Sequence, residues 1–189
     1  MKKKVTIYCA SSKNVADIYL KSAFSLGEKI AKSNCEIIYG GGNVGLMGCL
    51  ADGAISSGGH ITGIIPDFLK SLELGHTGIT KLTTVSGLHE RQKIMMESAD
   101  IIMALPGGCG TFLEIMEAIT WKKLGRIDCP IIIINVNNYF DDFIKTLQKA
   151  IDEGFMRKDH ITLWTVVDDV ESAVRFLHNN IEFVHYDIV

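Results

Sequence analysis

Residues 36–48 read Glu-Ile-Ile-Tyr-Gly-Gly-Gly-Asn-Val-Gly-Leu-Met-Gly. The apolar start predicts a short buried strand, and the glycines after it predict a tight turn into a helix. Glycine tolerates positive φ and lets a ligand approach the backbone, while the start of the next helix directs unpaired N–H groups at an anion. We therefore expect a phosphate-bearing ligand here, with Gly41, Gly42 and Gly45 as contacts.

The same alternation of short apolar runs and longer helical patterns continues along the chain. The expected strands are residues 5–10, 36–39, 60–65, 79–85, 101–105, 131–136 and 161–166. Several of these runs are almost continuously apolar, as is typical of strands covered on both faces. Apolar stripes predict helices between them, the first including Ile18, Phe24, Leu26 and Ile30 and the last starting at Asp168 or Asp169. This order predicts one α/β domain over residues 1–189, with a doubly wound, Rossmann-like, mainly parallel sheet and helices on both faces.

Composition narrows the class of protein. The 189 residues include 19 Lys and Arg against 22 Asp and Glu, a net charge of −3 that argues against a broad nucleic-acid surface. No apolar stretch approaches the ~20 residues that span a membrane. Five widely spaced cysteines without a C-x-x-C pair, and six histidines without metal-ligand spacing, indicate neither a disulfide framework nor a metal site. We expect a cytoplasmic protein.

A second glycine-rich turn covers residues 106–114, Pro-Gly-Gly-Cys-Gly-Thr-Phe-Leu-Glu. Ligands of doubly wound folds bind beyond the carboxyl ends of the strands, so both turns are expected to face one crevice and hold one phosphorylated ligand. The spacing of Thr111 and Glu114 leaves a structural alternative open. Thr111 would cap the helix, and Glu114 would reach back to a backbone N–H as in a capping box.

Arg91 lies near the start of a helical stretch between the two turns, before the strand that delivers the second. The guanidinium group suits phosphate or carboxylate recognition. The alternative is a solvated helix face on which Arg91 pairs with Glu90 or Glu97.

A dinucleotide site is also compatible with the first turn. Gly40, Gly42 and Gly45 match G-x-G-x-x-G, and Asp67 follows at a distance that suits a ribose contact. An NAD-dependent enzyme is therefore a second alternative.

Taken together, the turn at residues 40–48, the Pro-Gly-Gly-Cys-Gly-Thr-x-x-Glu motif and His89-Glu90-Arg91 resemble the LOG (Lonely guy) family of cytokinin riboside 5′-monophosphate phosphoribohydrolases. The resemblance extends from residues 9–12 through 120–125 to 153–155. It implies hydrolysis of the N-glycosidic bond of an adenine or N6-prenyladenine nucleoside 5′-monophosphate. The products are the free base and ribose 5-phosphate.

The resemblance also assigns roles to residues. It implies that Arg91 and Glu114 are the catalytic pair, without a cofactor, in a homodimer whose sites lie near the subunit interface. The substrate contacts implied by the motif positions are Glu73, Arg91, Gly107, Gly108, Gly110, Thr111 and Thr120. Gln92 replaces a lysine that is usual in the family, so the second basic contact is lost or displaced to Lys93. Cys109 stands where tyrosine is frequent, and no catalytic histidine pairs with it.

Two other functions have been associated with proteins of this fold or family. Molybdenum-cofactor carriers share the glycine-rich architecture, so a non-hydrolytic carrier of a nucleotide or of that cofactor is the main alternative. Proteins of this family have also been labelled lysine decarboxylases, but the sequence gives no independent sign of a lysine for pyridoxal phosphate.

Overall fold

Seven strands form one parallel sheet in the computed structural model, which describes residues 2–70 and 75–178. Their order across the sheet is β4-β3-β2-β1-β5-β6-β7. The strands are β1 (Lys4–Tyr8), β2 (Glu36–Tyr39), β3 (His60–Pro66), β4 (Lys81–Val85), β5 (Ile101–Ala104), β6 (Ile131–Ile134) and β7 (Thr165–Val167). Each adjacent pair is parallel, with Val5 beside Ile37 on one side and Ile101 on the other. The predicted doubly wound architecture is confirmed.

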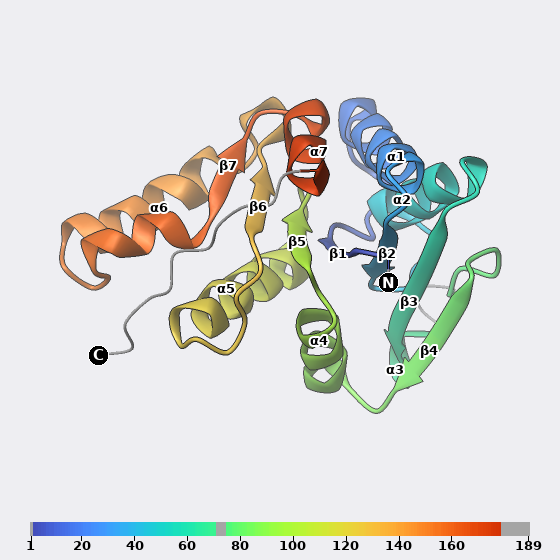
Figure 1. Ribbon diagram of the computed structural model, residues 1–189, viewed down its shortest axis with the longest axis horizontal. Helices are drawn as coiled ribbons and strands as arrows, with labels where there is room; N and C mark the ends of the chain where they lie inside the picture. Colours follow the sequence, from blue (N-terminus) through green and yellow to red (C-terminus); the bar gives the residue numbers. More distant parts are fainter. Residues whose placement is uncertain (1, 71–74, 179–189) are drawn as a thin grey trace.

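Helices cover both faces of the sheet. The α-helices are α1 (Asp17–Lys32), α2 (Gly45–Ser56), α3 (Asp67–Lys70), α4 (Leu88–Glu97), α5 (Cys109–Lys123), α6 (Asp141–Asp152) and α7 (Val170–His178). One core cluster joins the sheet to α1, α2 and α7, and a second joins it to α4, α5 and α6. In Figure 1, α1 and α7 lie in the upper part of the view, and α4 and α5 lie in the lower part. None of the described helices is long and apolar enough to cross a membrane.

The apolar stripe predicted for α1 is buried only in part: Leu26 and Ile30 lie in the core, as predicted. The buried residues of the helix are Ala23, Leu26, Gly27 and Ile30, spaced i, i+3, i+4 and i+7. A Cβ on Gly27 would lie 2.1 Å from the Leu50 carbonyl oxygen, so α1 and α2 meet backbone against backbone. This close approach selects small residues at the contact. Ile18 and Phe24, which we assigned to the core stripe, are 47% and 37% exposed, so that assignment was wrong.

The seventh strand was predicted too early in the chain. Residues 161–166 were expected to form it, but Lys158–Leu163 forms a 3-10 helix (η2), and β7 covers Thr165–Val167. The Arg157 backbone N–H donates to Nδ1 of His160 at 3.2 Å, which helps to hold the start of η2. Ile161 is exposed and Leu163 is buried, although residues two apart would share one face of a strand, so this part of the predicted strand is a helical turn.

The strand order indicates at which edge of the sheet a ligand is expected to bind. Strands β1 to β4 progress in one direction across the sheet, and β5 lies on the other side of β1. The reversal therefore falls between β1 and β5, and in doubly wound folds the crevice for a ligand opens at the carboxyl ends of such a pair. The loop after β1 and the second glycine-rich turn, which follows β5, flank this crevice.

The start of α7 yields a first prediction. The Asp169 carboxylate accepts the Ser172 N–H at 2.7 Å as an N-cap, and hydrogen bonds from Ser172 lower the pKa of Asp169. We expect Asp169→Ala to reduce the free energy of unfolding by about 0.5–2 kcal/mol at neutral pH, and Asp169→Asn to retain most of it. Urea denaturation measures both.

The pH dependence has a defined sign. Because the pKa is lowered in the folded state, the stabilising contribution is complete above the ordinary carboxyl value of 3.8 and is lost as the pH falls through the folded-state pKa. The advantage of the wild type over Asp169→Ala should therefore shrink in acid. An advantage that is constant down to pH 2 would contradict the assignment.

Candidate active site

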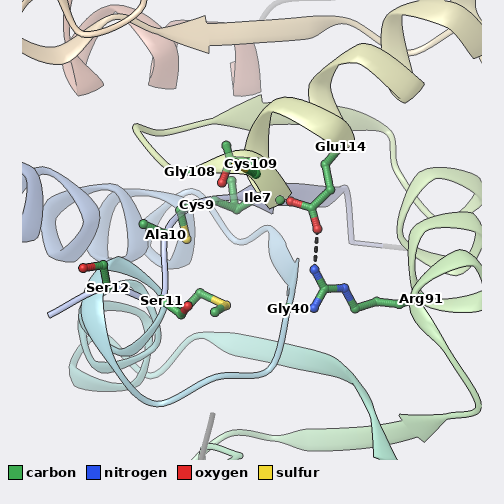
Figure 2. Close-up of a pocket in the computed structure, with 13 residues that line it drawn as sticks. Ile7, Cys9, Ala10, Ser11, Ser12, Gly40, Arg91, Gly108, Cys109 and Glu114 are labelled. Carbon is green, nitrogen blue, oxygen red and sulfur yellow. Dashed lines mark hydrogen bonds and ion pairs between the residues drawn. The ribbon is translucent and has the colours of Figure 1, made fainter. Parts of the chain in front are cut away.

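A cavity of about 280 Å³ opens at the predicted edge of the sheet. Its wall comes from the loop after β1, the turn after β2, helix α4 and the start of α5 (Figure 2). The lining residues are Ile7, Cys9, Ala10, Ser11, Ser12, Gly40, Met47, Arg91, Gly108, Cys109, Gly110, Thr111 and Glu114. Both glycine-rich turns therefore reach a single cavity, as the sequence predicted.

Arg91 and Glu114 form an ion pair on the wall of this cavity. Nη2 of Arg91 donates to Oε1 of Glu114 at 2.6 Å, and the two side chains are only 11% and 5% exposed. Figure 2 shows the guanidinium and carboxylate groups facing each other. Arg91 lies on α4, before β5, and Glu114 lies on α5, after it, so one short strand brings them together.

The solvated alternative for Arg91 is contradicted. Glu90 instead accepts hydrogen bonds from the backbone N–H and hydroxyl of Ser86, and Glu97 lies 3.9 Å from Lys93. Arg91 is 9% exposed, which is not the exposure of a solvated surface residue. Its guanidinium group is therefore held for a partner inside the protein.

The capping-box alternative is also contradicted. Helix α5 begins at Cys109, and its N-cap is Gly108, so Thr111 lies within the first turn instead of capping it. Glu114 is one turn further along and faces Arg91. Both side chains are buried at the cavity, with Thr111 3% exposed and Glu114 5% exposed.

The start of α5 supplies the part of the wall that suits an anion. The N-cap Gly108 has no side chain with which to satisfy the first N–H groups of the helix. Gly110 and Thr111 in this first turn also line the cavity. Gly107 is not among the lining residues and packs against Thr111, because an added Cβ on Gly107 would lie 2.0 Å from Oγ1 of Thr111. The helix N-terminus thus directs positive potential towards the cavity.

The first glycine-rich turn has mainly a packing role. Gly40 and Met47 line the cavity, but Gly41, Gly42 and Gly45 do not. Gly42 forms an isolated bridge with Gly75, and the Gly41 carbonyl accepts the His76 N–H at 3.0 Å. Gly45 has φ +61°, and a Cβ there would lie 2.3 Å from the Ser12 carbonyl oxygen. This turn therefore supports the loop after β1, and substrate contacts from these three glycines stay a prediction.

Ser11 and Ser12 were missed as candidate site residues. They follow β1 and lie across the cavity from Arg91 (Figure 2). The available signal was two adjacent hydroxyl groups directly after the strand at which the sheet order reverses. Cys109 also lies on the wall and is exposed.

Other predicted contacts lie elsewhere. Thr120 is exposed on α5, and its hydroxyl donates to the Met116 carbonyl at 2.7 Å. Gln92 is buried, but it is not on the cavity wall, and neither are Lys93 and Asp67. Glu73 lies outside the described residues.

Tyr8 is buried near Glu114. Burial, together with the negative charge of Glu114, raises the pKa of Tyr8 well above its usual value. The phenol therefore stays neutral, and Arg91 supplies the positive charge next to the carboxylate. Within the described parts of the chain, no group of three or more His, Cys, Asp or Glu side chains could hold a metal ion.

Comparison with known proteins gives related sequences. A family model described as "Possible lysine decarboxylase" matches residues 47–177. Cytokinin riboside 5′-monophosphate phosphoribohydrolase LOG2 of Arabidopsis thaliana is 38% identical over 154 residues, covering 82% of this chain and 72% of that protein. The cytokinin riboside 5′-monophosphate phosphoribohydrolase of Rhodococcoides fascians is 36% identical over 173 residues, covering 91% and 87%.

Solved structures share the fold. The molybdenum cofactor carrier protein of Chlamydomonas reinhardtii superposes with a TM-score of 0.70 at 21% identity, covering 94% of this chain and 97% of that one. The molybdenum cofactor binding protein of Rippkaea orientalis gives 0.72 at 21% identity, with coverage of 94% and 96%. At this identity the likeness describes the architecture alone.

Two glycines of the second turn provide a matched test of its packing. A Cβ on Gly107 would collide with the Thr111 side chain, whereas a Cβ on Gly110 meets nothing within 4 Å. We expect Gly107→Ala to lower the free energy of unfolding by about 1–3 kcal/mol and Gly110→Ala to leave it unchanged or raise it slightly. Chemical denaturation measures both, and equal effects would contradict this packing.

Proposed function

This chain belongs to the LOG family of cytokinin riboside 5′-monophosphate phosphoribohydrolases, and we propose that it hydrolyses the N-glycosidic bond of purine nucleoside 5′-monophosphates. The products are a free adenine-type base and ribose 5-phosphate. The observation that carries the proposal is the buried Arg91–Glu114 pair, which lies on the same cavity wall as the N-terminus of α5. A carboxylate and an anion-binding helix end are the two features that this reaction needs in one site.

Glu114 is proposed to act on the sugar. Breaking the bond between the anomeric carbon and the purine nitrogen builds positive charge on the ribose ring. A carboxylate at the anomeric carbon stabilises this charge and can accept a proton from the attacking water. The water oxygen forms the new bond to the anomeric carbon, the electrons of the old bond leave with the base, and the base takes up a proton.

Arg91 is proposed to orient the carboxylate. At 2.6 Å its guanidinium group favours the ionised form of Glu114 and fixes the direction of Oε1. The phosphate is proposed to bind the first N–H groups of α5, with the Ser11 and Ser12 hydroxyls across the cavity as further donors. Binding energy from the phosphate then aligns the bond to be cut, which is remote from it.

The alternatives have less support. The likeness to molybdenum cofactor carriers is limited to the fold at 21% identity, while the relatives at 36–38% identity carry hydrolase names. The family description mentions lysine decarboxylation, and pyridoxal phosphate enzymes require a lysine for the Schiff base. The described wall of the cavity contains arginine but no lysine.

The assembly and location are proposed as a cytoplasmic homodimer with the sites near its interface. Leu88 on α4 and Leu113 and Met116 on α5 are 40%, 52% and 39% exposed, and Leu113 directly precedes Glu114. A second copy of the chain that packs against these exposed apolar side chains would remove them from water, which favours formation of the dimer. None of the five cysteines, all of which lie in the described residues, forms a disulfide, which suits a reducing compartment.

The catalytic pair can be tested by substitution. We expect Glu114→Gln and Arg91→Gln to reduce kcat/KM for base release by about a hundredfold or more, because each removes a charge used in the transition state. Liquid chromatography of the released base measures this with AMP and isopentenyl-AMP. Glu117→Gln is the matched control, because Glu117 is a half-buried residue of α5 that does not line the cavity. Retained turnover in folded Glu114→Gln would overturn the assignment.

The role of the phosphate can be tested with the same assay. We expect adenosine to be cleaved at least about tenfold less efficiently than AMP, since it lacks the group that the helix N-terminus binds. GMP and CMP, with their nucleosides, define the preference for the base. Cleavage of adenosine and AMP at equal rates would exclude phosphate anchoring.

A further inference from the structure

Tyr139 contacts the second glycine-rich turn from a distant part of the sequence. It follows the short 3-10 helix η1 (Val136–Asn138) after β6. Its hydroxyl donates a hydrogen bond to the Gly107 carbonyl oxygen at 2.6 Å. Gly107 belongs to the turn that starts α5, so this contact ties the phosphate side of the proposed site to the loop after β6.

The ring of Tyr139 is held by aromatic neighbours. It lies edge-on to Tyr19 and Phe140, with centroid distances of 5.9 and 5.1 Å, and stacks over Phe112 at 6.4 Å with planes 17° apart. Such pairs add orientation as well as apolar contact. The hydroxyl therefore comes from a fixed ring.

The backbone before Tyr139 is also constrained. Asn137 and Asn138 adopt φ values of +53° and +58°, a left-handed conformation that asparagine tolerates better than most residues. The Asn135 side chain closes the loop, because its Oδ1 accepts the Phe140 N–H at 2.7 Å. The loop thus places Tyr139 at one defined position beside the turn.

Peptide geometry links the Tyr139 contact to the cavity. The chain as described has no cis peptide bond, so the Gly107 carbonyl and the Gly108 N–H lie in one peptide plane and point in opposite directions. The carbonyl points at Tyr139, and Gly108 lines the cavity. A peptide between two glycines rotates with little steric restriction, so an external anchor decides its orientation.

We propose that Tyr139 is a positioning residue that holds the Gly107–Gly108 peptide so that the Gly108 N–H is presented to the phosphate monoester. This inference rests on the proposed function and assigns part of its phosphate recognition to a side chain that does not line the cavity. Tyr139 acts on the ligand only through the peptide. Its loss therefore weakens phosphate binding and leaves the Arg91–Glu114 pair in place.

The test uses Tyr139→Phe, which removes the hydroxyl and keeps the ring. We expect KM for AMP to rise about three- to tenfold, the range of one hydrogen bond, with kcat within about twofold of the wild type. Discrimination between AMP and adenosine should fall by the same factor, and the thermal midpoint should change little. A purely structural role would lower the midpoint without changing this discrimination.

Tyr19→Phe is the matched control. Tyr19 packs against the same ring, and its hydroxyl accepts a hydrogen bond from Asn137 at 3.4 Å instead of contacting the turn. We expect its KM for AMP to match the wild type. Equal KM values for Tyr139→Phe and the wild type would overturn the positioning role while leaving the proposed hydrolase intact.

If the wild type releases no base from any nucleotide, the proposed function is refuted. The role of Tyr139 is then tested by comparing how tightly the wild type and Tyr139→Phe bind AMP. Isothermal titration of AMP then decides: a three- to tenfold higher Kd for Tyr139→Phe supports the role, and an unchanged Kd, or no AMP binding by the wild type, overturns it.

Discussion

The ion pair between Arg91 and Glu114 is the interaction on which the rest of the site depends. Removing two charges from water carries a desolvation cost, and a buried partner left alone is strongly destabilising. Apolar burial elsewhere on the same helices offsets this cost: Met95 and Met96 of α4 and Ile115 of α5 are buried in the core and hold the two helices against the sheet. The charges are thus held at a 2.6 Å separation where the cavity exposes them to a ligand.

The sheet could be predicted because its central strands carry an unambiguous pattern. The run of four isoleucines at residues 131–134 is buried throughout, and a short β-branched apolar run of this kind is typical of a strand covered on both faces. Periodicity failed where the surroundings decide burial. Ile161 is exposed and Leu163 is buried within one 3-10 helix, and Phe24 is 37% exposed on α1, whose contact with α2 is made through glycine.

The site was only partly predictable for a related reason. The spacing of Thr111 and Glu114 is the same for a helix cap as for a cavity wall. On a solvated helix face, Arg91 would form an ion pair with Glu90 or Glu97 instead of Glu114. The resemblance favoured the catalytic pair, and the packing of α4 and α5 on either side of β5 separates these readings physically. Gly45 shows the opposite case, since its backbone contact with Ser12 explains a glycine that the motif alone assigns to a ligand.

The placement of the pair around one strand has a consequence for how the chain can vary in length. Arg91 and Glu114 are 23 residues apart, and the segment between them consists of a helix end, β5 and the turn that opens α5. An insertion or deletion there would shift one charge relative to the other. A change in the length of a loop at the opposite ends of the strands would not act on this separation directly, because that loop lies outside the segment that joins the two groups.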